Sequence, residues 1–154
     1  ERSARVEDFS ELHRLQEDLS DTLSHWRRTT GYGRGIAAPQ IGVLKRVVFI
    51  SIDKPWLLVN PLITWMSEKR MTVWDACLSY LCIFFQVSRA EKIKVSYQDE
   101  NGQEKEVVAE GALSELLQHE IDHLDGILAI DRVSDVRTIC TREEYEKRYA
   151  PKNV

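Results

Sequence analysis

Three residues in the last third of the chain have the types and the spacing of a hydrolytic metal site. His119 and His123 are four positions apart, so on a helix their imidazoles lie on one face and both can reach one ion. Glu120 follows the first histidine by one position, about 100° around the helix axis. From there its carboxylate can take a proton from a water molecule without binding the ion. The pattern therefore predicts metal-assisted hydrolysis.

Two histidines do not complete such a site, because a catalytic zinc-type centre usually has three protein ligands and one open position. A protease pattern with a third histidine six positions after His123 is excluded, because that residue is Ala129. Glu143 or Glu144 remains an alternative, although a capping box at the start of a helix explains that pair better. Cys77 is the stronger candidate, because a thiolate binds borderline-soft divalent ions well. Spacing alone leaves the choice open.

The composition is that of an ordinary globular protein. The 154 residues, 43% hydrophobic and 30% charged, are enough for a single domain over 1–154 with a substantial core. The net charge of −4 comes with both signs interleaved along the chain, so we expect no nucleic-acid site. We also expect no membrane partner, because no apolar run has the length of a membrane span. Three cysteines form an odd and sparse set, typical of a reducing compartment.

The apolar pattern predicts the elements that precede the metal motif. Leucines and aromatic residues recur every three or four positions over residues 6–26, which predicts an amphipathic N-terminal helix. The segment 31–42 is rich in glycine, so its backbone can approach another group closely. The β-prone runs are 46–50, 56–60, 71–74, 92–98 and 104–108. Residues 99–102 are a hairpin signal between the last two runs.

The helical period returns over residues 112–124 and ends at Gly126, so the metal motif lies on a helix. Residues 127–130 are predicted to be a short strand or an extended run. A capping-box signal at 141–144 begins a short C-terminal helix that Pro151 stops. This order predicts an α+β fold with mainly antiparallel sheets packed around a central helix.

Three segments, in this order, resemble the peptide deformylase family. They are GRGIAAPQ at 33–40, CLS at 77–79 and QHEIDH at 118–123; further similar stretches cover 57–61 and 95–102. The resemblance implies an enzyme that removes the N-formyl group from the N-terminal methionine of new polypeptides, which can be presented on the ribosome. It also implies a bacterial cytoplasmic location, or an organelle if a targeting segment has been trimmed upstream.

The resemblance assigns roles to particular residues. The implied metal ligands are Cys77, His119 and His123, holding one divalent ion: Fe²⁺ in the family, with Zn²⁺ or Ni²⁺ as replacements. Glu120 would move the proton, while the Gln40 side chain and the Leu78 backbone N–H would bind the developing oxyanion. Gly33 and Gly35 would let the substrate backbone lie along a strand edge. The side chains implied for the methionine pocket are those of Ile36 and Leu116.

Two departures from the family pattern lie around the cysteine. Where the family usually has Glu-Gly before it, this chain has Asp75-Ala76, and we expect Asp75 to keep the family's ion pair, here with Arg89. Where the family tends to have a Val-Pro-Gly turn, residues 80–85 are bulky and apolar. These residues predict a different wall of the substrate site, a partner surface, or packing.

Glu115 adds a third departure, because it puts a charge near the expected methionine pocket. One alternative function is therefore a deformylase-like amidase with another N-acyl substrate or weakened activity. Another is a binding module with a structural metal ion, against which Glu120 and Gln40 speak, because a structural site needs neither.

Overall fold

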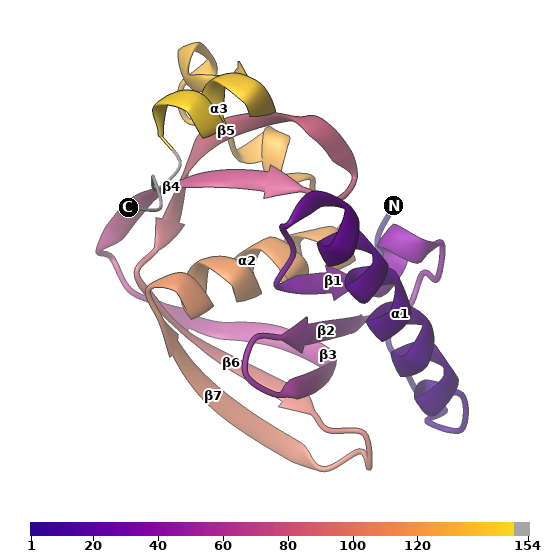
Figure 1. Ribbon diagram of the computed structural model, residues 1–154. Helices are drawn as coiled ribbons and strands as arrows, with labels where there is room; N and C mark the ends of the chain where they lie inside the picture. The colour runs from indigo at the N-terminus through magenta and orange to yellow at the C-terminus, as the bar shows by residue number, and fades with distance from the viewer. Residues whose placement is uncertain (150–154) are drawn as a thin grey trace.

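The computed structural model describes residues 1–149, which form two antiparallel sheets on either side of one helix (Figure 1). The helices are α1 (Leu12–Thr30), η1 (Ala38–Ile41), α2 (Ala112–Leu124), η2 (Ala129–Arg132), η3 (Val136–Thr138) and α3 (Arg142–Arg148). The strands are β1 (Gly35–Ala37), β2 (Val47–Ser51), β3 (Pro55–Met66), β4 (Arg70–Cys77), β5 (Tyr80–Ala90), β6 (Lys92–Gln98), β7 (Glu104–Glu110) and β8 (Cys140–Thr141). The predicted α+β fold around a central helix is confirmed.

The larger sheet has the order β1-β2-β3-β6-β7, and the smaller sheet has the order β4-β5-β8. Alternation along β2 explains how the larger sheet is covered on both faces. Val48 and Ile50 pack with the α2 side, whereas Val47 and Phe49 pack with the leucines of α1. A strand buried on both faces is expected to be apolar, and β2 is apolar from Val47 to Ile50.

Helix α2 is the buried centre of the fold, since every residue from Ser114 to Leu124 is buried. Leu117 and Ile121 belong to the core that α2 shares with the larger sheet. Gln118 joins the helix to the end of β5: its Oε1 accepts from the Ala90 N–H at 3.0 Å and its Nε2 donates to the Ala90 carbonyl at 2.9 Å. The helix that carries the chemistry is therefore held from both sides.

The N-terminal helix is shifted from its predicted range of 6–26, because the residues before Leu12 are held by backbone contacts instead. Ala4 forms a parallel bridge with Lys45. The Val6 N–H donates to Asn60 Oδ1 at 2.8 Å, and the Val6 carbonyl accepts from Asn60 Nδ2 at 2.9 Å. The helix ends at Gly31, whose φ of 78° is left-handed and suits glycine.

The β5 strand is the main element missing from the predicted runs. It pairs with β4 in a long hairpin, and Phe85 and Val87 are fully buried there. Of residues 127–130, predicted to be a short strand or an extended run, Leu128 is extended, but η2 begins at Ala129. The predicted cap of the last helix is confirmed in part: Thr141 Oγ1 accepts from the Glu144 N–H. Pro151 lies outside the described residues.

The remaining predicted runs all overlap strands, although β3 continues beyond 56–60 to Met66 and β4 continues beyond 71–74 to Cys77. The central helix and the strand at 92–98 have the predicted bounds, and 99–102 forms the turn between β6 and β7. Within residues 1–149, no helix is both long and apolar enough to cross a membrane.

Asn60 is expected to contribute more to stability than its size suggests. It has a φ of 52°, and its Nδ2 also donates to Gln98 Oε1 at 2.7 Å. We predict that Asn60→Ala lowers the free energy of unfolding by about 2–3 kcal/mol, because it removes buried hydrogen bonds and strains the backbone. Urea unfolding measures this. Asn60→Gly removes the same hydrogen bonds but adds no backbone strain, so its free energy of unfolding should fall by less. An alanine variant as stable as the wild type would contradict the prediction.

Candidate active site

Three donor atoms from two elements meet beside the central helix. His119 and His123 project from successive turns of α2, with their Nε2 atoms 3.2 Å apart. Cys77, the last residue of β4, places its Sγ 3.2 Å from His123 Nε2. All three side chains are buried, and their ligand atoms lie within 4.8 Å of one another. One thiolate and two imidazoles make a donor set that suits a divalent transition metal with one position left open.

The alternative third ligands lie elsewhere. Glu143 and Glu144 belong to α3, where Glu144 Oε2 is 2.5 Å from Arg148 Nε. Neither glutamate belongs to a group of potential metal ligands among the described residues. The fold therefore brings Cys77 to the histidines and leaves both glutamates out.

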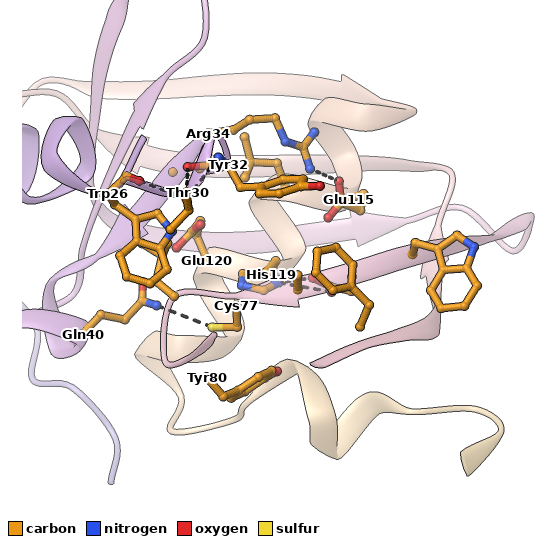
Figure 2. A pocket seen from close by; sticks show the side chains of 18 of the residues that line it. Trp26, Thr30, Tyr32, Arg34, Gln40, Cys77, Tyr80, Glu115, His119 and Glu120 are labelled. Carbon is orange, nitrogen blue, oxygen red and sulfur yellow. Dashed lines mark hydrogen bonds and ion pairs between the residues drawn. The ribbon is translucent and has the colours of Figure 1, made fainter. Parts of the chain in front are cut away.

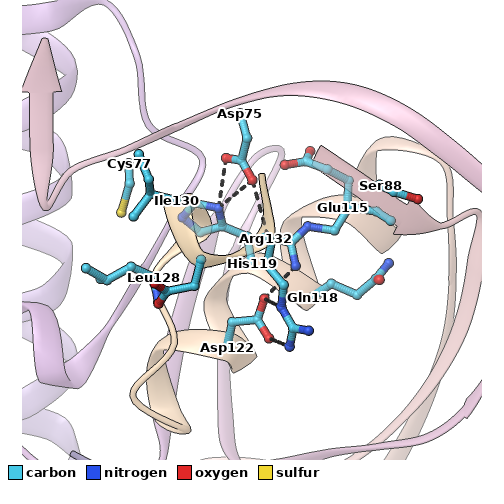
Figure 3. Close-up of polar contacts among 12 residues, drawn as sticks. Asp75, Cys77, Ser88, Glu115, Gln118, His119, Asp122, Leu128, Ile130 and Arg132 are labelled. Atoms are coloured by element: carbon cyan, nitrogen blue, oxygen red, sulfur yellow. Dashed lines mark hydrogen bonds and ion pairs between the residues drawn. The ribbon is translucent and has the colours of Figure 1, made fainter. Parts of the chain in front are cut away.

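Asp75 supports the first histidine from the strand that carries the cysteine. Residues two apart on a strand face the same side, so Asp75 and Cys77 both point toward α2. Asp75 Oδ1 lies 2.9 Å from His119 Nδ1, which leaves Nε2 free to face the donor cluster (Figure 3). Burial alone would raise the pKa of Asp75, but His119 and Arg89 hold it below its ordinary value.

The expected pair between Asp75 and Arg89 is present. Arg89 Nη2 donates to Asp75 Oδ2 at 3.2 Å, and its Nη1 donates to Asp122 Oδ2 at 2.5 Å. Arg132 donates to the same Asp122 carboxylate from the outer side (Figure 3). A chain of charges thus runs from the surface to the first histidine. Asp122 and Arg132 were not among the predicted site residues, and no signal in the sequence singled them out.

The thiol of Cys77 is prepared for ligation. Burial alone would raise its pKa, but hydrogen bonds and charge interactions with His119 and His123 lower the pKa of Cys77 to about 5. The thiolate, which is the form that binds metal, therefore predominates at neutral pH.

Glu120 is buried beside the cluster, and one of its carboxylate oxygens forms no hydrogen bond within the described residues. Its Oε2 has no hydrogen-bond partner among the described residues. Burial raises the pKa of Glu120 to about 7, against the opposing effect of His119 and His123. A carboxyl group with a pKa near neutrality can both take and return a proton. Gly35 makes room for it, since a Cβ at that position would lie 2.9 Å from Glu120 Oε1.

Gln40 and Leu78 line the cavity beside Cys77. The Ala37 N–H donates to Gln40 Oε1 at 2.9 Å, so the amide turns its donor end toward the site. Gln40 Nε2 is 3.6 Å from Cys77 Sγ and 3.3 Å from Ser79 Oγ. Leu78 lines the same cavity. Only the NH₂ end of an amide can donate to an oxyanion, so this orientation decides what Gln40 can do.

A cavity of about 200 Å³ opens onto these residues. Gly33, Gly35 and Leu116, which were predicted to lie at the substrate site, line this cavity. Ile36 does not line it: this residue is in the core between α1 and β2. On the short strand β1 the side chains alternate, so Gly35 faces Glu120 while Ile36 faces the opposite side. The cavity wall includes Arg34 instead.

Within residues 80–85, some side chains form part of the cavity wall and others pack in the core of the smaller sheet. Phe84 lines the cavity and stacks on Tyr145 of α3, with ring centroids 4.2 Å apart. Phe85 is in the core of the smaller sheet. Tyr80 lines the cavity, and its hydroxyl oxygen accepts from the Ile130 N–H. The part of α3 in this wall, through Arg142 and Tyr145, was not foreseen from the sequence.

A family model described as polypeptide deformylase matches residues 1–138. The chain belongs to this family. It is therefore a deformylase-type hydrolase of a metal-dependent family. A peptide deformylase of Bartonella tribocorum is 36% identical over 150 residues, covering 92% of this chain and 82% of the relative. One from Pelotomaculum thermopropionicum is 40% identical over 132 residues, covering 85% and 81%. The crystal structure of peptide deformylase from Thermotoga maritima has a TM-score of 0.82 at 34% identity, covering 88% and 90%.

The close contact at Gly35 predicts a catalytic defect without loss of metal. We expect Gly35→Ala to lower kcat by about a hundredfold, because the added methyl group displaces the Glu120 carboxylate by a fraction of an ångström or more. Steady-state kinetics and metal analysis of the same preparation measure this. Gly102→Ala, in the turn between β6 and β7, is the control: its φ of 78° makes the change costly for stability, and the atoms nearest to an added Cβ belong to Phe9. Equal kcat values for Gly35→Ala and the wild type would refute the prediction.

Proposed function

We propose that Cys77, His119 and His123 hold the divalent ion with which this deformylase removes the N-formyl group from the N-terminal methionine of newly made polypeptides. The observation that carries the proposal is the buried donor cluster beside Glu120 Oε2, which has no hydrogen-bond partner in the described part of the chain. Cys77, His119 and Glu120 all line one cavity. A bound divalent ion supplies Lewis acidity and lowers the pKa of water. We propose Fe²⁺, which the family resemblance favours; Zn²⁺ and Ni²⁺ suit the same donors.

The chain's own residues account for the movement of protons and charge. Glu120 takes a proton from the attacking water, whose oxygen forms the new bond to the formyl carbon. As the formyl oxygen gains negative charge, the Gln40 amide and the Leu78 N–H donate to it. Glu120 then returns the proton to the amine nitrogen as the C–N bond breaks. The products are formate and a peptide with a free N-terminus.

Asp75 has a positioning role in this scheme. Its bond to His119 Nδ1 keeps the ligating nitrogen directed at the cluster, and Arg89 keeps Asp75 ionised and in place. Cys77 reaches the same point from β4. The ligand geometry therefore depends on the docking of the smaller sheet onto α2.

The partner that follows from this function is an N-formylmethionyl peptide. We propose that residues 1–154 act as one catalytic domain, because α3, beyond the family match, still contributes to the cavity wall. Presentation of the substrate on the ribosome and a cytoplasmic location stay predictions.

Glu120→Ala tests the role of the general base. We expect it to keep one metal ion per chain and to lower kcat by about a thousandfold, because proton transfer by a positioned side chain contributes about 10²–10⁴-fold. Metal analysis and kinetics on a formyl-Met peptide measure both. Glu143→Ala serves as the matched control on an exposed glutamate, with unchanged metal content and rate. Loss of metal from Glu143→Ala would overturn the ligand assignment.

A comparison of acyl groups tests the reaction itself. The metal-loaded enzyme should hydrolyse a formyl-Met peptide at least about a hundredfold faster than the acetyl-Met peptide of the same sequence, because the added methyl group must fit between the Gln40 amide and the buried cluster. Formate release and free-amine assays measure the two rates. Equal rates would instead support the alternative of a broader N-acyl amidase.

A further inference from the structure

An ion pair lies on the cavity wall, one helical turn before the first histidine ligand. Glu115 belongs to α2 and its side chain is only 8% exposed. Arg34, from the segment before β1, places its Nη2 2.5 Å from Glu115 Oε2, and its Nη1 donates to the Ala112 carbonyl at 3.3 Å. The Arg34 side chain is 44% exposed and lies at the rim. Both residues line the cavity that contains His119 and Glu120.

The pair occupies the side of the cavity toward which a substrate must extend. In Figure 2, Gln40 and Cys77 lie on one side of His119, whereas Arg34 and Glu115 lie on the other. If Gln40 binds the formyl oxygen, as proposed above, the rest of the substrate leaves in the opposite direction. Its first side chain then meets the ion pair.

Glu115 is not needed for metal binding at this place. Its carboxylate lies within 4.8 Å of Asp75 and His119, which together have the composition of a second donor group. However, each of the two carboxylates already has a positively charged partner: Arg34 pairs with Glu115, and Arg89 pairs with Asp75. The group is therefore a compensated charge network, and its accessible edge faces the substrate.

A partly buried ion pair discriminates between side chains by desolvation. An apolar side chain that covers it removes water from both charges and returns no hydrogen bond. A carboxamide can replace that water on both partners, since its NH₂ group can donate to Glu115 and its oxygen can accept from Arg34. Tyr32 and Phe84, on the same cavity, can pack against the aliphatic part of such a side chain.

We infer that the Arg34–Glu115 pair is a specificity determinant that lets this enzyme accept N-formyl peptides with a carboxamide first side chain, and that it weakens selection for methionine. This inference rests on the proposed deformylase function. Glutamine is the natural probe, because it is close to methionine in length and differs mainly in its hydrogen-bonding end.

The test compares kcat/KM for formyl-Met-Ala-Ser and formyl-Gln-Ala-Ser on the metal-loaded enzyme. In the double variant Arg34→Leu/Glu115→Leu, we expect the Met-to-Gln ratio to rise by about tenfold or more, because the wall becomes apolar. The control is Lys94→Leu/Glu106→Leu, an exposed cross-strand pair of β6 and β7, which should leave the ratio unchanged. The dissociation constants of the unformylated peptides Met-Ala-Ser and Gln-Ala-Ser, measured by calorimetry, should likewise show a stronger preference for Met in the double variant.

Single and isosteric variants keep the test decisive if the double variant folds poorly. Arg34→Leu leaves a buried carboxylate unpaired, so it should lower the melting temperature more than Glu115→Leu, which leaves only a rim arginine. Glu115→Gln keeps the shape and removes the charge, and it should raise the Met-to-Gln ratio in part.

The outcomes separate the inference from the function on which it rests. A wild type that hydrolyses formyl-Met, with a ratio that none of these variants changes, overturns the inference and leaves the function standing. A metal-loaded wild type that hydrolyses neither peptide overturns the proposed function. In that case the ratio of the dissociation constants of the two unformylated peptides still shows whether the Arg34–Glu115 pair discriminates between side chains.

Discussion

A helix that buries a run of polar side chains is destabilising unless nearly every one of them finds a partner. Helix α2 buries seven such residues: Ser114, Glu115, Gln118, His119, Glu120, Asp122 and His123. Their partners come from elsewhere in the chain. Ala90 bonds Gln118 through its backbone, Asp75 bonds His119, and Arg89 bonds Asp122. The smaller sheet must therefore dock onto this face of the helix for the fold to be stable.

The same requirement explains the chemistry. Cys77 is two residues from Asp75 on the same face of β4, so the docking that brings Asp75 to His119 also brings Cys77 to His123. Glu120 is the exception, because its buried Oε2 has no hydrogen-bond partner within residues 1–149. An unpaired buried oxygen is costly, and it persists here at the place where a reacting group would receive a proton. The unpaired oxygen is therefore better understood as part of the site than as a defect of packing.

How much could be foreseen from the sequence differs from residue to residue. The period of α2 and the position of Glu120 follow from local spacing, so both were predicted correctly. The third member of the donor cluster could not be chosen by spacing, because 41 residues, including a whole hairpin, lie between Cys77 and His119. The place of Ile36 depends on the facing of a three-residue strand, which has too few alternations to reveal its direction. Residues 80–85 have the composition of a strand, but no strand was predicted there because the family tends to have a turn at this place.

The two carboxylates on neighbouring turns of α2 have opposite surroundings, and two consecutive residues produce the difference. Arg34 neutralises Glu115, whereas Gly35 leaves space beside Glu120 and offers it no donor. Since Arg34 points to one turn and Gly35 opens onto the next, a substitution at position 34 changes the substrate wall without touching the base. A substitution at position 35 reaches the base, because an added Cβ there would lie 2.9 Å from Glu120 Oε1. The reaction and the choice of substrate therefore depend on separate turns of one helix, which allows one to vary while the other is kept.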